Sequence, residues 1–185
     1  MTFLTTKLPG CFEVRFTAHC DDRGLLVKTT QVSAFREFGL ETGFAETLYS
    51  VSGENVLRGM HLQLAPAQQA KLIYCVSGSV MDVALDLRPD SEACGTFAVI
   101  ELSGSTHNAA YLPAGVAHGF YVRSAPAILC YHITSEHAPG CDAGVAWDSF
   151  GAPWPTSTPL VSRRDSDLPP LTEFLTVPML GHNSY

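Results

Sequence analysis

The sequence predicts an all-β fold in which short strands close into a barrel or pack as a sandwich. Most of the chain consists of short alternating or β-branched stretches bounded by Gly, Pro, Ser and Asp, which is the pattern of such folds. Helical periodicity is confined to a few short segments. With 185 residues, 46% of them hydrophobic and 16% charged, the chain has the size and composition of one ordered globular domain. We therefore expect a single domain over residues 1–185, with its core barrel at about residues 45–135.

The strand pattern recurs along most of the chain before residue 135. The expected strands are Cys11–Phe16, Gly24–Gln31, Thr47–Ser52, Leu57–Leu64, Lys71–Ser77, Ser79–Asp86, Phe97–Leu102, Ala109–Leu112, His118–Val122 and Ala127–Ile133. Ser77-Gly78-Ser79 is interpreted as a hairpin turn, because glycine adopts a positive φ without steric cost. The strands before residue 45 predict an N-terminal hairpin or arm outside the barrel.

The helical signals are short. Val32–Phe38 is the clearest early one, with two phenylalanines three residues apart and Ser33 available as a cap. Near the C-terminus, Ser162–Asp165 resembles a helix start, and Thr172–Thr176 predicts another turn of helix. Residues 152–159 contain three prolines and should form an irregular arm. The sequence thus predicts a barrel followed by short C-terminal helices.

The charge of the chain excludes some classes of partner. A net charge of -7 and a pI near 5.4 argue against binding to nucleic acid or to an anionic membrane, which would repel the protein overall. A local basic pocket for a small anion remains compatible with this balance. The N-terminus lacks the charged start and apolar run of a secretion signal, and no window approaches a membrane-spanning length. We therefore expect a cytoplasmic protein.

The cysteines show no metal or redox motif. They are scattered singly, without the close pairs that zinc sites and redox centres use. Their positions are Cys11, Cys20, Cys75, Cys94, Cys130 and Cys141. Reduced thiols in the core are the expected state.

A histidine and a glutamine share one face of a predicted strand. Period-two alternation places His61 and Gln63 on one side, and Met60 and Leu62 on the other. Polar side chains inside a barrel cost free energy unless they meet partners or a ligand. Two interpretations stay open from this window: a ligand-binding cavity, or a histidine whose hydrogen bonds are satisfied within the core.

A second motif, Pro113-x-Gly115-x-x-His118, has the strand–turn–strand shape found in cupins. A metal-binding cupin also needs His-x-His followed by a carboxylate, whereas this chain offers His61-x-Gln63. An amide replaces one of the three or four ligands that such a site requires. The pattern predicts a cupin without a metal, and a metal-dependent cupin enzyme is the alternative.

The order of motifs over nearly the whole chain resembles one known family. The matching segments are Asp22-Arg23-Gly24, Val56-Leu57-Arg58-Gly59-x-His61-x-Gln63, Gln69-Ala70-Lys71-Leu72, Gly78 with Asp82–Arg88, Leu102-Ser103, Pro113–Phe120, Tyr131 and Ser162-x-x-Asp165. They fall in the same order as in the dTDP-4-dehydrorhamnose 3,5-epimerase family. This resemblance implies a metal-independent, cofactor-free cupin jelly roll that forms homodimers. It also implies a nucleotide-diphosphate sugar as the small-molecule partner, with inversion of carbons next to the ketone of a 4-keto-6-deoxyhexose.

The resemblance assigns roles that the chemistry of such a reaction requires. Removing a proton α to a ketone needs a base, a group that stabilises the enolate oxygen, and an acid on the opposite ring face. By similarity His61 is the base, and Asp165 orients its imidazole. Lys71 stabilises the enolate and Tyr131 returns the proton. Without the resemblance, Lys71 is also compatible with an exposed surface lysine, and Tyr131 with an aromatic residue of a strand that has no catalytic role.

Further positions match substrate contacts of the family. Arg23 and Arg58 match its diphosphate contacts. Guanidinium groups are suited to this role, since their paired N–H donors fit phosphate oxygens. The resemblance further implies that Arg23 reaches the site of the other subunit. The remaining substrate-binding residues implied by the resemblance are Gln63, His118, Arg164 and Asp142, the last at a position normally held by glutamate.

The sequence departs from the family pattern at three places that the resemblance puts near the nucleotide. Lys28 stands where an acid is usual, Glu46-Thr47-Leu48 replaces Gln-Asp-Asn, and His137 replaces a tyrosine. Lys28 and Glu46 are nevertheless expected among the substrate contacts. A cytidine or guanosine diphosphate sugar is therefore an alternative to a thymidine one. Inversion at C3 alone, at C5 alone or at both centres also stays open, as does a non-catalytic sugar-nucleotide binding module.

Overall fold

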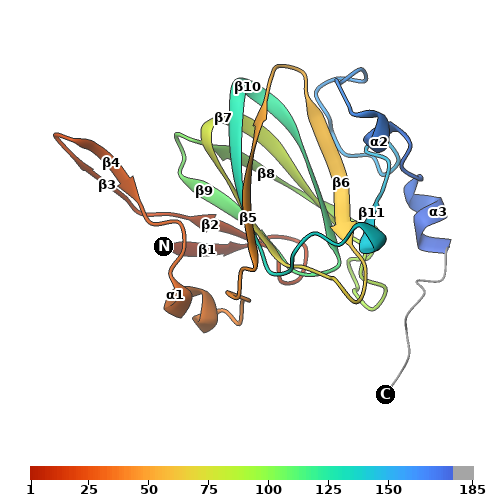
Figure 1. The fold of residues 1–185 in the computed structure, drawn as a ribbon, viewed down its shortest axis with the longest axis horizontal. Coiled ribbons are helices and arrows are strands. Elements are labelled where there is room, and N and C mark those ends of the chain that lie inside the picture. Colours follow the sequence, from red (N-terminus) through yellow and green to blue (C-terminus); the bar gives the residue numbers. More distant parts are fainter. Residues whose placement is uncertain (177–185) are drawn as a thin grey trace.

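The computed structural model describes residues 1–176 and confirms the all-β prediction (Figure 1). Its strands are β1 (Thr2–Thr5), β2 (Phe12–Arg15), β3 (Ala18–Asp21), β4 (Gly24–Val27), β5 (Glu46–Ser52), β6 (Leu57–Gln63), β7 (Lys71–Asp86), β8 (Phe97–Ser103), β9 (Asn108–Leu112), β10 (Val116–Ile133) and β11 (Asp142–Gly144). The helices are α1 (Val32–Glu37), the 3₁₀ turn η1 (Pro139–Cys141), α2 (Arg163–Ser166) and α3 (Leu171–Thr176). None of these helices is long and apolar enough to cross a membrane.

The strands form an antiparallel jelly-roll barrel of the cupin type. The main sheet has nine strands in the order β1-β2-β9-β7-β10-β6-β11, with β5 on β10 and β8 on β7. The strands β3 and β4 form a separate hairpin. Figure 1 shows this hairpin projecting from the side of the barrel that lies away from α2 and α3. The predicted N-terminal hairpin and short C-terminal helices are therefore both present.

Two strands run through the barrel without interruption, which makes the predicted hairpin at Ser77-Gly78-Ser79 wrong. The strand β7 continues from Lys71 to Asp86, and β10 likewise joins the two strands expected at 118–122 and 127–133. Gly78 has a φ of 73°, and a Cβ there would lie 2.3 Å from the carbonyl oxygen of Ser124 in β10. The register of the two strands shifts in this region. Glycine therefore permits an irregularity in the pairing of β7 with β10, not a chain reversal.

Other differences concern local details. The strand that begins at Gly24 ends at Val27 instead of Gln31. Helix α1 forms as predicted, but its N-cap is Gln31 and no side chain caps it, so Ser33 is not the cap. Ser162 does cap α2 as expected. The six cysteines are free, but only Cys11 and Cys75 are buried; Cys20 is exposed and the other three are half-buried.

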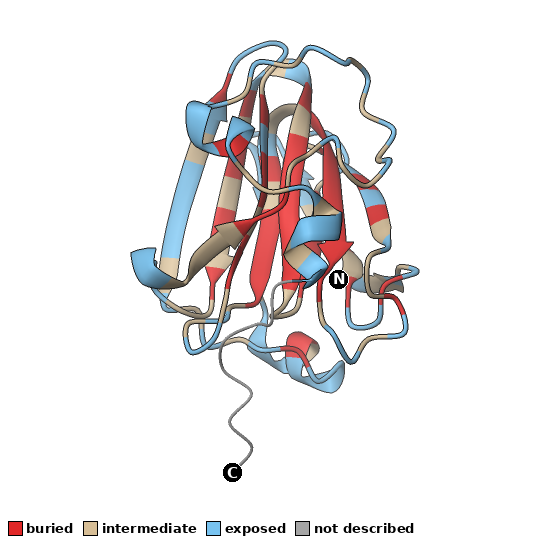
Figure 2. Ribbon diagram, turned by 90° about the vertical axis from the view of Figure 1, so that its right-hand side faces the viewer, coloured by how far each residue is buried: buried red, intermediate tan, exposed pale blue. Residues whose placement is uncertain are grey.

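Buried apolar side chains form three separate clusters. One cluster fills the barrel interior, with Ile73, Ala84 and Phe120 among its members. A second lies on the outer face of β6, β7 and β10, where Met60 and Leu62 pack beneath the C-terminal segment. A third lies under α1 and the N-terminal strands. Figure 2 shows the buried residues concentrated along the central strands, with exposed segments outside them. Met60 and Leu62 therefore face away from the interior, as the alternation predicts.

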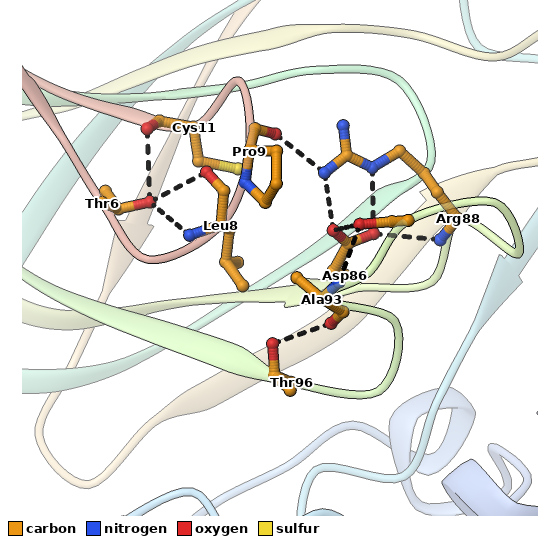
Figure 3. A network of polar contacts seen from close by, with 9 residues as sticks. Thr6, Leu8, Pro9, Cys11, Asp86, Arg88, Ala93 and Thr96 are labelled. Carbon is orange, nitrogen blue, oxygen red and sulfur yellow. Dashed lines mark hydrogen bonds and ion pairs between the residues drawn. The ribbon is translucent and has the colours of Figure 1, made fainter.

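A polar network ties the end of β7 to the N-terminal loop (Figure 3). Asp86 is fully buried, and its carboxylate accepts hydrogen bonds from Arg88 Nε at 2.9 Å and Ser91 Oγ at 2.7 Å. Arg88 Nη2 also donates to the Pro9 carbonyl at 2.8 Å. Burial raises the pKa of Asp86, but the hydrogen bonds from Arg88 and Ser91 hold it below its ordinary value. The carboxylate is therefore charged and fully engaged.

Replacing Asp86 by asparagine should reduce the free energy of unfolding at pH 7 by about 2 to 3 kcal/mol, because the Arg88 guanidinium loses its buried partner. Since the pKa of Asp86 is lower in the folded state, its contribution is present above pH 4 and fades as the pH falls further. Urea titrations at pH 7 and pH 3 measure this. An equal loss of stability at both pH values would contradict the charged pairing.

Candidate active site

One cavity gathers most of the polar side chains that the sequence singles out. It has a volume of about 330 Å³. Its lining consists of Leu48, Ser50, Arg58, His61, Gln69, Lys71, His118, Phe120, Tyr131, Ile133 and Arg164. A larger cavity of about 600 Å³ lies near the ends of β6 and β7, but its lining is mainly apolar and its Arg88 is already paired with Asp86. The smaller cavity is the candidate site, because convergent polar groups mark a catalytic pocket better than volume does.

Two glycines let the strands that carry the histidines approach each other closely. Gly59 has a φ of 122°, and a Cβ at that position would lie 2.4 Å from the Cα of Gly119. The backbone of β6 therefore lies against that of β10. In this pairing His61 lies directly opposite His118. The Gly-x-His and His-Gly pairs of the sequence thus position both rings at one cavity.

His61 and Asp165 form a hydrogen-bonded pair at this cavity. His61 Nε2 lies 2.8 Å from Asp165 Oδ1, and Asp165 Oδ2 accepts the N–H of Gly59 at 3.1 Å. Helix α2 presents the carboxylate, and its capping residue Ser162 accepts the N–H of Asp165 at 3.1 Å. Burial raises the pKa of Asp165, but hydrogen bonds from His61, Gly59 and Ser162 bring it below its ordinary value. The carboxylate is therefore ionised at neutral pH and fixes the orientation of the imidazole.

Lys71 is buried at the start of β7, which excludes the solvated surface lysine that remained open from the sequence. Only 6% of the residue is exposed, and Nζ donates to the carbonyl of His61 at 3.0 Å. Burial lowers the pKa of Lys71 to about 8, opposed by the charges of Asp142 and Asp82. The side chain is therefore an ammonium at neutral pH with little surrounding water, where a charge acts strongly on a neighbouring group.

Tyr131 lies in β10 with its hydroxyl directed to Ser50, 3.3 Å from Ser50 Oγ. The residue is 9% exposed, and burial raises the pKa of its phenol. The phenol therefore keeps its proton at neutral pH and can donate it. The sequence alone favours a strand aromatic here, and only the cavity lining distinguishes the two interpretations.

Arg58 and Arg164 bring positive charge to the same cavity. Arg58 is held in place by Nε, which donates to Ser52 Oγ at 3.0 Å. Arg164 forms an ion pair with Asp142, with Nη2 2.5 Å from Oδ2. This pair links α2 to β11, and β11 in turn pairs with β6. An acidic protein thus offers a local cationic patch that suits an anionic ligand.

Gln63 faces inward but lies outside the lining of this cavity. Its amide nitrogen donates to the carbonyl of Ala67 at 2.8 Å, and its oxygen accepts the N–H of Ala138 at 2.6 Å. These bonds connect two loops at the end of β6. Its substrate contact stays a prediction, while its contacts in the structure explain a buried amide without any ligand.

Unlike Arg58, three predicted substrate contacts lie outside the cavity lining: Arg23, Lys28 and Glu46. Arg23 lies in the turn of the β3–β4 hairpin, paired with Asp21 and with a 90% exposed side chain. Lys28 is exposed just after β4. Glu46 does lie beside His137, because Glu46 Oε2 accepts the N–H of His137 at 2.8 Å. Two of the positions that depart from the family pattern are therefore neighbours.

One charged residue behind the cavity wall was not predicted from the sequence to belong to the site. Asp82 is buried in β7, and its Oδ2 lies 2.6 Å from His118 Nε2. A carboxylate between Met81 and Val83, in the middle of an apolar strand, is the signal that could have identified it. Within residues 1–176, no group of three or more His, Cys, Asp or Glu side chains is placed to hold a metal ion.

Comparison with known proteins gives a consistent result. The family model described as dTDP-4-dehydrorhamnose 3,5-epimerase matches residues 5–173. The Escherichia coli dTDP-4-dehydrorhamnose 3,5-epimerase is 35% identical over 185 residues, covering 98% of this chain and 100% of the relative. A dTDP-4-dehydrorhamnose 3-epimerase of Streptomyces niveus is 36% identical over 163 residues, covering 86% of this chain and 79% of the relative.

A solved structure agrees with the sequence comparison. NovW, a 4-keto-6-deoxy sugar epimerase from the novobiocin gene cluster of Streptomyces spheroides, superposes with a TM-score of 0.89 at 34% identity. The superposition covers 94% of this chain and 88% of NovW. The likeness therefore extends over the barrel and both of its flanking segments. On these grounds the chain belongs to the dTDP-4-dehydrorhamnose 3,5-epimerase family.

Proposed function

We propose that this protein is an epimerase that inverts C3, C5 or both centres of a nucleotide-diphosphate-linked 4-keto-6-deoxy sugar, in deoxysugar biosynthesis. The observation that supports this most directly is the convergence of His61, Lys71 and Tyr131 on one cavity, with Asp165 bonded to His61. A pure binding module has no use for a base, a buried cation and a buried acid together. We further propose that the reaction takes place in the cytoplasm, without metal or cofactor.

The reaction follows from the contacts of the four residues. Since Asp165 is ionised and lies at His61 Nε2, that nitrogen carries the ring proton and Nδ1 is free to act as the base. His61 removes the proton α to the ketone, and the C–H electron pair forms the enolate double bond while the carbonyl pair moves to oxygen. The Lys71 ammonium stabilises that oxyanion. Tyr131 then donates its proton to the carbon from the other ring face, and solvent exchange restores both groups.

Deuterium exchange tests this function. The protein is incubated in D₂O with dTDP-4-keto-6-deoxyglucose, and NMR follows incorporation at C3 and C5. Incorporation at either carbon, with inversion, supports the proposal and identifies which centres react. Absence of incorporation at both carbons, from dTDP, CDP and GDP forms of the sugar alike, would overturn it.

We propose thymidine as the nucleotide, because the names of the relatives specify dTDP sugars. Glu46 and His137 favour the cytidine or guanosine alternative, since they stand side by side where the family pattern differs. Calorimetric titration with dTDP, CDP and GDP separates the two. A tenfold preference for CDP or GDP would replace thymidine in the proposal.

We also propose a homodimer in which Arg23 completes the site of the partner subunit. The outer face of the barrel exposes Tyr49, Val51 and Val76, with exposed fractions of 70%, 54% and 52%. The hairpin that carries Arg23 exposes Leu25 and Leu26 as well. Such apolar surface near a projecting hairpin suits contact with a second copy.

Mixing two impaired variants tests the trans role of Arg23. In a heterodimer of Arg23→Ala and His61→Asn subunits, one site combines an intact His61 with an intact Arg23 of the partner subunit. Subunit exchange should therefore restore activity to about one quarter of the wild-type value. If Arg23 acts within its own subunit, the mixture stays as inactive as its components.

The lowered pKa of Lys71 predicts how activity depends on pH. Because the oxyanion needs an ammonium, kcat/KM should fall as the pH rises above about 8, the pKa that burial gives Lys71. Lys71→Met should abolish turnover, whereas Lys7→Met, at an exposed position, serves as the control. A pH–rate profile that stays flat between pH 7 and pH 10 would contradict the role of Lys71.

Stability should move in the opposite direction from activity. The pKa of Lys71 is about 8 in the folded protein against 10.5 for an unperturbed lysine, so burying its charge costs about 3 kcal/mol below pH 8. Since the unfolded chain binds more protons between those values, the wild type should gain stability as the pH rises through them. Lys71→Met should remove that rise. Denaturant titrations at pH 7 and pH 10 measure the difference.

A further inference from the structure

Asp82 is the most unusual charged group in the described part of the chain. Its side chain is fully buried in the middle of β7, and Oδ2 lies 2.6 Å from Nε2 of His118, itself 6% exposed. Among the described residues, Oδ1 of Asp82 is buried without a hydrogen-bond partner. Leaving a buried carboxylate oxygen unpaired is costly, and it calls for an explanation.

Asp86 shows what a structural aspartate on this strand looks like. It lies four residues further along β7, on the same face by alternation, and is buried to the same extent. Both of its oxygens accept hydrogen bonds, from Arg88 and Ser91. Asp82 has one donor instead. Less of its charge is therefore neutralised by hydrogen bonds, and more of it acts on His118.

The surroundings of Asp82 connect it to the reacting groups. His118 lies opposite His61 in the β6–β10 pairing and lines the cavity. Its ring makes an edge contact with Tyr131 at 6.0 Å between centroids. Asp82 is also close enough to Lys71 for its charge to oppose the lowering of the Lys71 pKa. The carboxylate thus lies directly behind the wall that carries these residues.

We propose that Asp82 is a positioning residue of the reaction: it accepts the Nε2 proton of His118 and holds the ring as an imidazolium, so that Nδ1–H is a second donor to the enolate oxygen beside Lys71. This inference rests on the proposed epimerase function. It assigns Asp82 and His118 a second histidine–aspartate pair with a task different from that of His61 and Asp165. The first pair accepts a proton, whereas the second keeps its proton throughout the cycle.

The hydrogen-bonding capacity of imidazole explains why the charge matters. With Nε2–H directed to Asp82, a neutral ring offers only a lone pair at Nδ1, which would repel a developing oxyanion. A protonated ring offers a donor there. A buried carboxylate with a single partner stabilises that protonated form. The enolate then meets two cations, and no proton needs to leave His118 when the oxyanion forms or collapses.

The test combines the protonation state of His118 with kinetics. The wild type is labelled with ¹⁵N-histidine, and the His118 signals are assigned by their loss in His118→Gln. At pH 7 we expect both His118 nitrogens to be protonated in the wild type, and only one in Asp82→Asn. We also expect kcat for deuterium incorporation to fall about 100-fold in Asp82→Asn, on the scale of a lost oxyanion donor, with KM changed less than about threefold.

Asp86→Asn is the matched control. It removes a carboxylate of equal burial from the same strand, and should cost stability while leaving kcat at 25 °C unchanged. A double-mutant comparison adds a readout that a structural role would not produce. If Asp82 acts through His118, adding Asp82→Asn to His118→Gln should lower kcat no further.

Distinct results would overturn the inference. A neutral His118 in the wild type, whichever ring nitrogen carries the proton, would refute the charge assignment without any variant. A folded Asp82→Asn protein whose kcat lies within about twofold of the wild type would refute the positioning role. Absence of deuterium incorporation in the wild type would instead refute the proposed function, and the NMR spectrum of His118 would still decide its charge.

Discussion

Replacing His61 by asparagine should lower epimerisation by about two to four orders of magnitude, the usual contribution of a general base. Asparagine preserves the approximate size of the side chain and a hydrogen-bonding group for Asp165, but it cannot accept a proton at neutral pH. Deuterium incorporation at the reacting carbon should fall by the same factor, because carbanion formation itself is lost. NMR of the substrate in D₂O measures both quantities in one experiment.

The control for this variant is His107→Asn. His107 has a φ of 51°, a conformation that asparagine adopts readily, and it lies outside the lining of the candidate cavity. This change should leave turnover and thermal stability close to the wild type. If His61→Asn retained near-normal incorporation, another group would be the base, and the pairing of His61 with Asp165 would be structural.

Replacing Tyr131 by phenylalanine should lower inversion by a similar factor but should spare proton removal. His61 still forms the enolate in this variant, and it can return a solvent-derived proton to the face from which it took one. Deuterium incorporation should therefore continue without inversion, a result that His61→Asn cannot give. Polarimetry or product NMR records inversion, while loss of the C3 or C5 proton signal records exchange.

Tyr121→Phe is the matched control on the same strand. Tyr121 donates to Asn55 Oδ1 at 3.2 Å, outside the candidate cavity, so removing its hydroxyl should leave both exchange and inversion intact. A Tyr131→Phe protein that inverts at the wild-type rate would show that another acid returns the proton. One in which exchange and inversion fall together would show that Tyr131 instead assists proton removal.

The sequence predicted the features that depend on local periodicity. Alternation along β6 predicted that His61 faces inward and that Met60 and Leu62 face outward. The structure confirms this, because His61 lines the cavity and the other two pack in the outer apolar cluster. The same alternation also turned Gln63 inward, where loop backbone engages its amide. Periodicity gives the side of a strand on which a residue lies. It does not give the partner that the residue meets there.

Long-range contacts explain what the sequence did not predict. Gly78 has the conformational freedom of a hairpin glycine, and only the nearby backbone of Ser124 and Pro126, more than forty residues away, shows that it lies at a register shift between two paired strands. Asp82 similarly has no local partner, because His118 lies 36 residues away in the chain. Such pairings depend on register between distant strands.

The residues proposed for proton transfer and those predicted to contact the nucleotide lie on different parts of the fold. Lys71, His118 and Tyr131 all belong to the two continuous central strands β7 and β10. The predicted nucleotide contacts Arg23 and Lys28 lie instead in or beside the peripheral hairpin, and Glu46 begins the edge strand β5. The β3–β4 hairpin pairs with no strand of the main sheet, so substitutions there leave the pairing of the barrel strands unchanged. Enzyme engineers could therefore exchange the β3–β4 hairpin between relatives to change nucleotide preference, while β5 stays in place because its Ser50 contacts Tyr131.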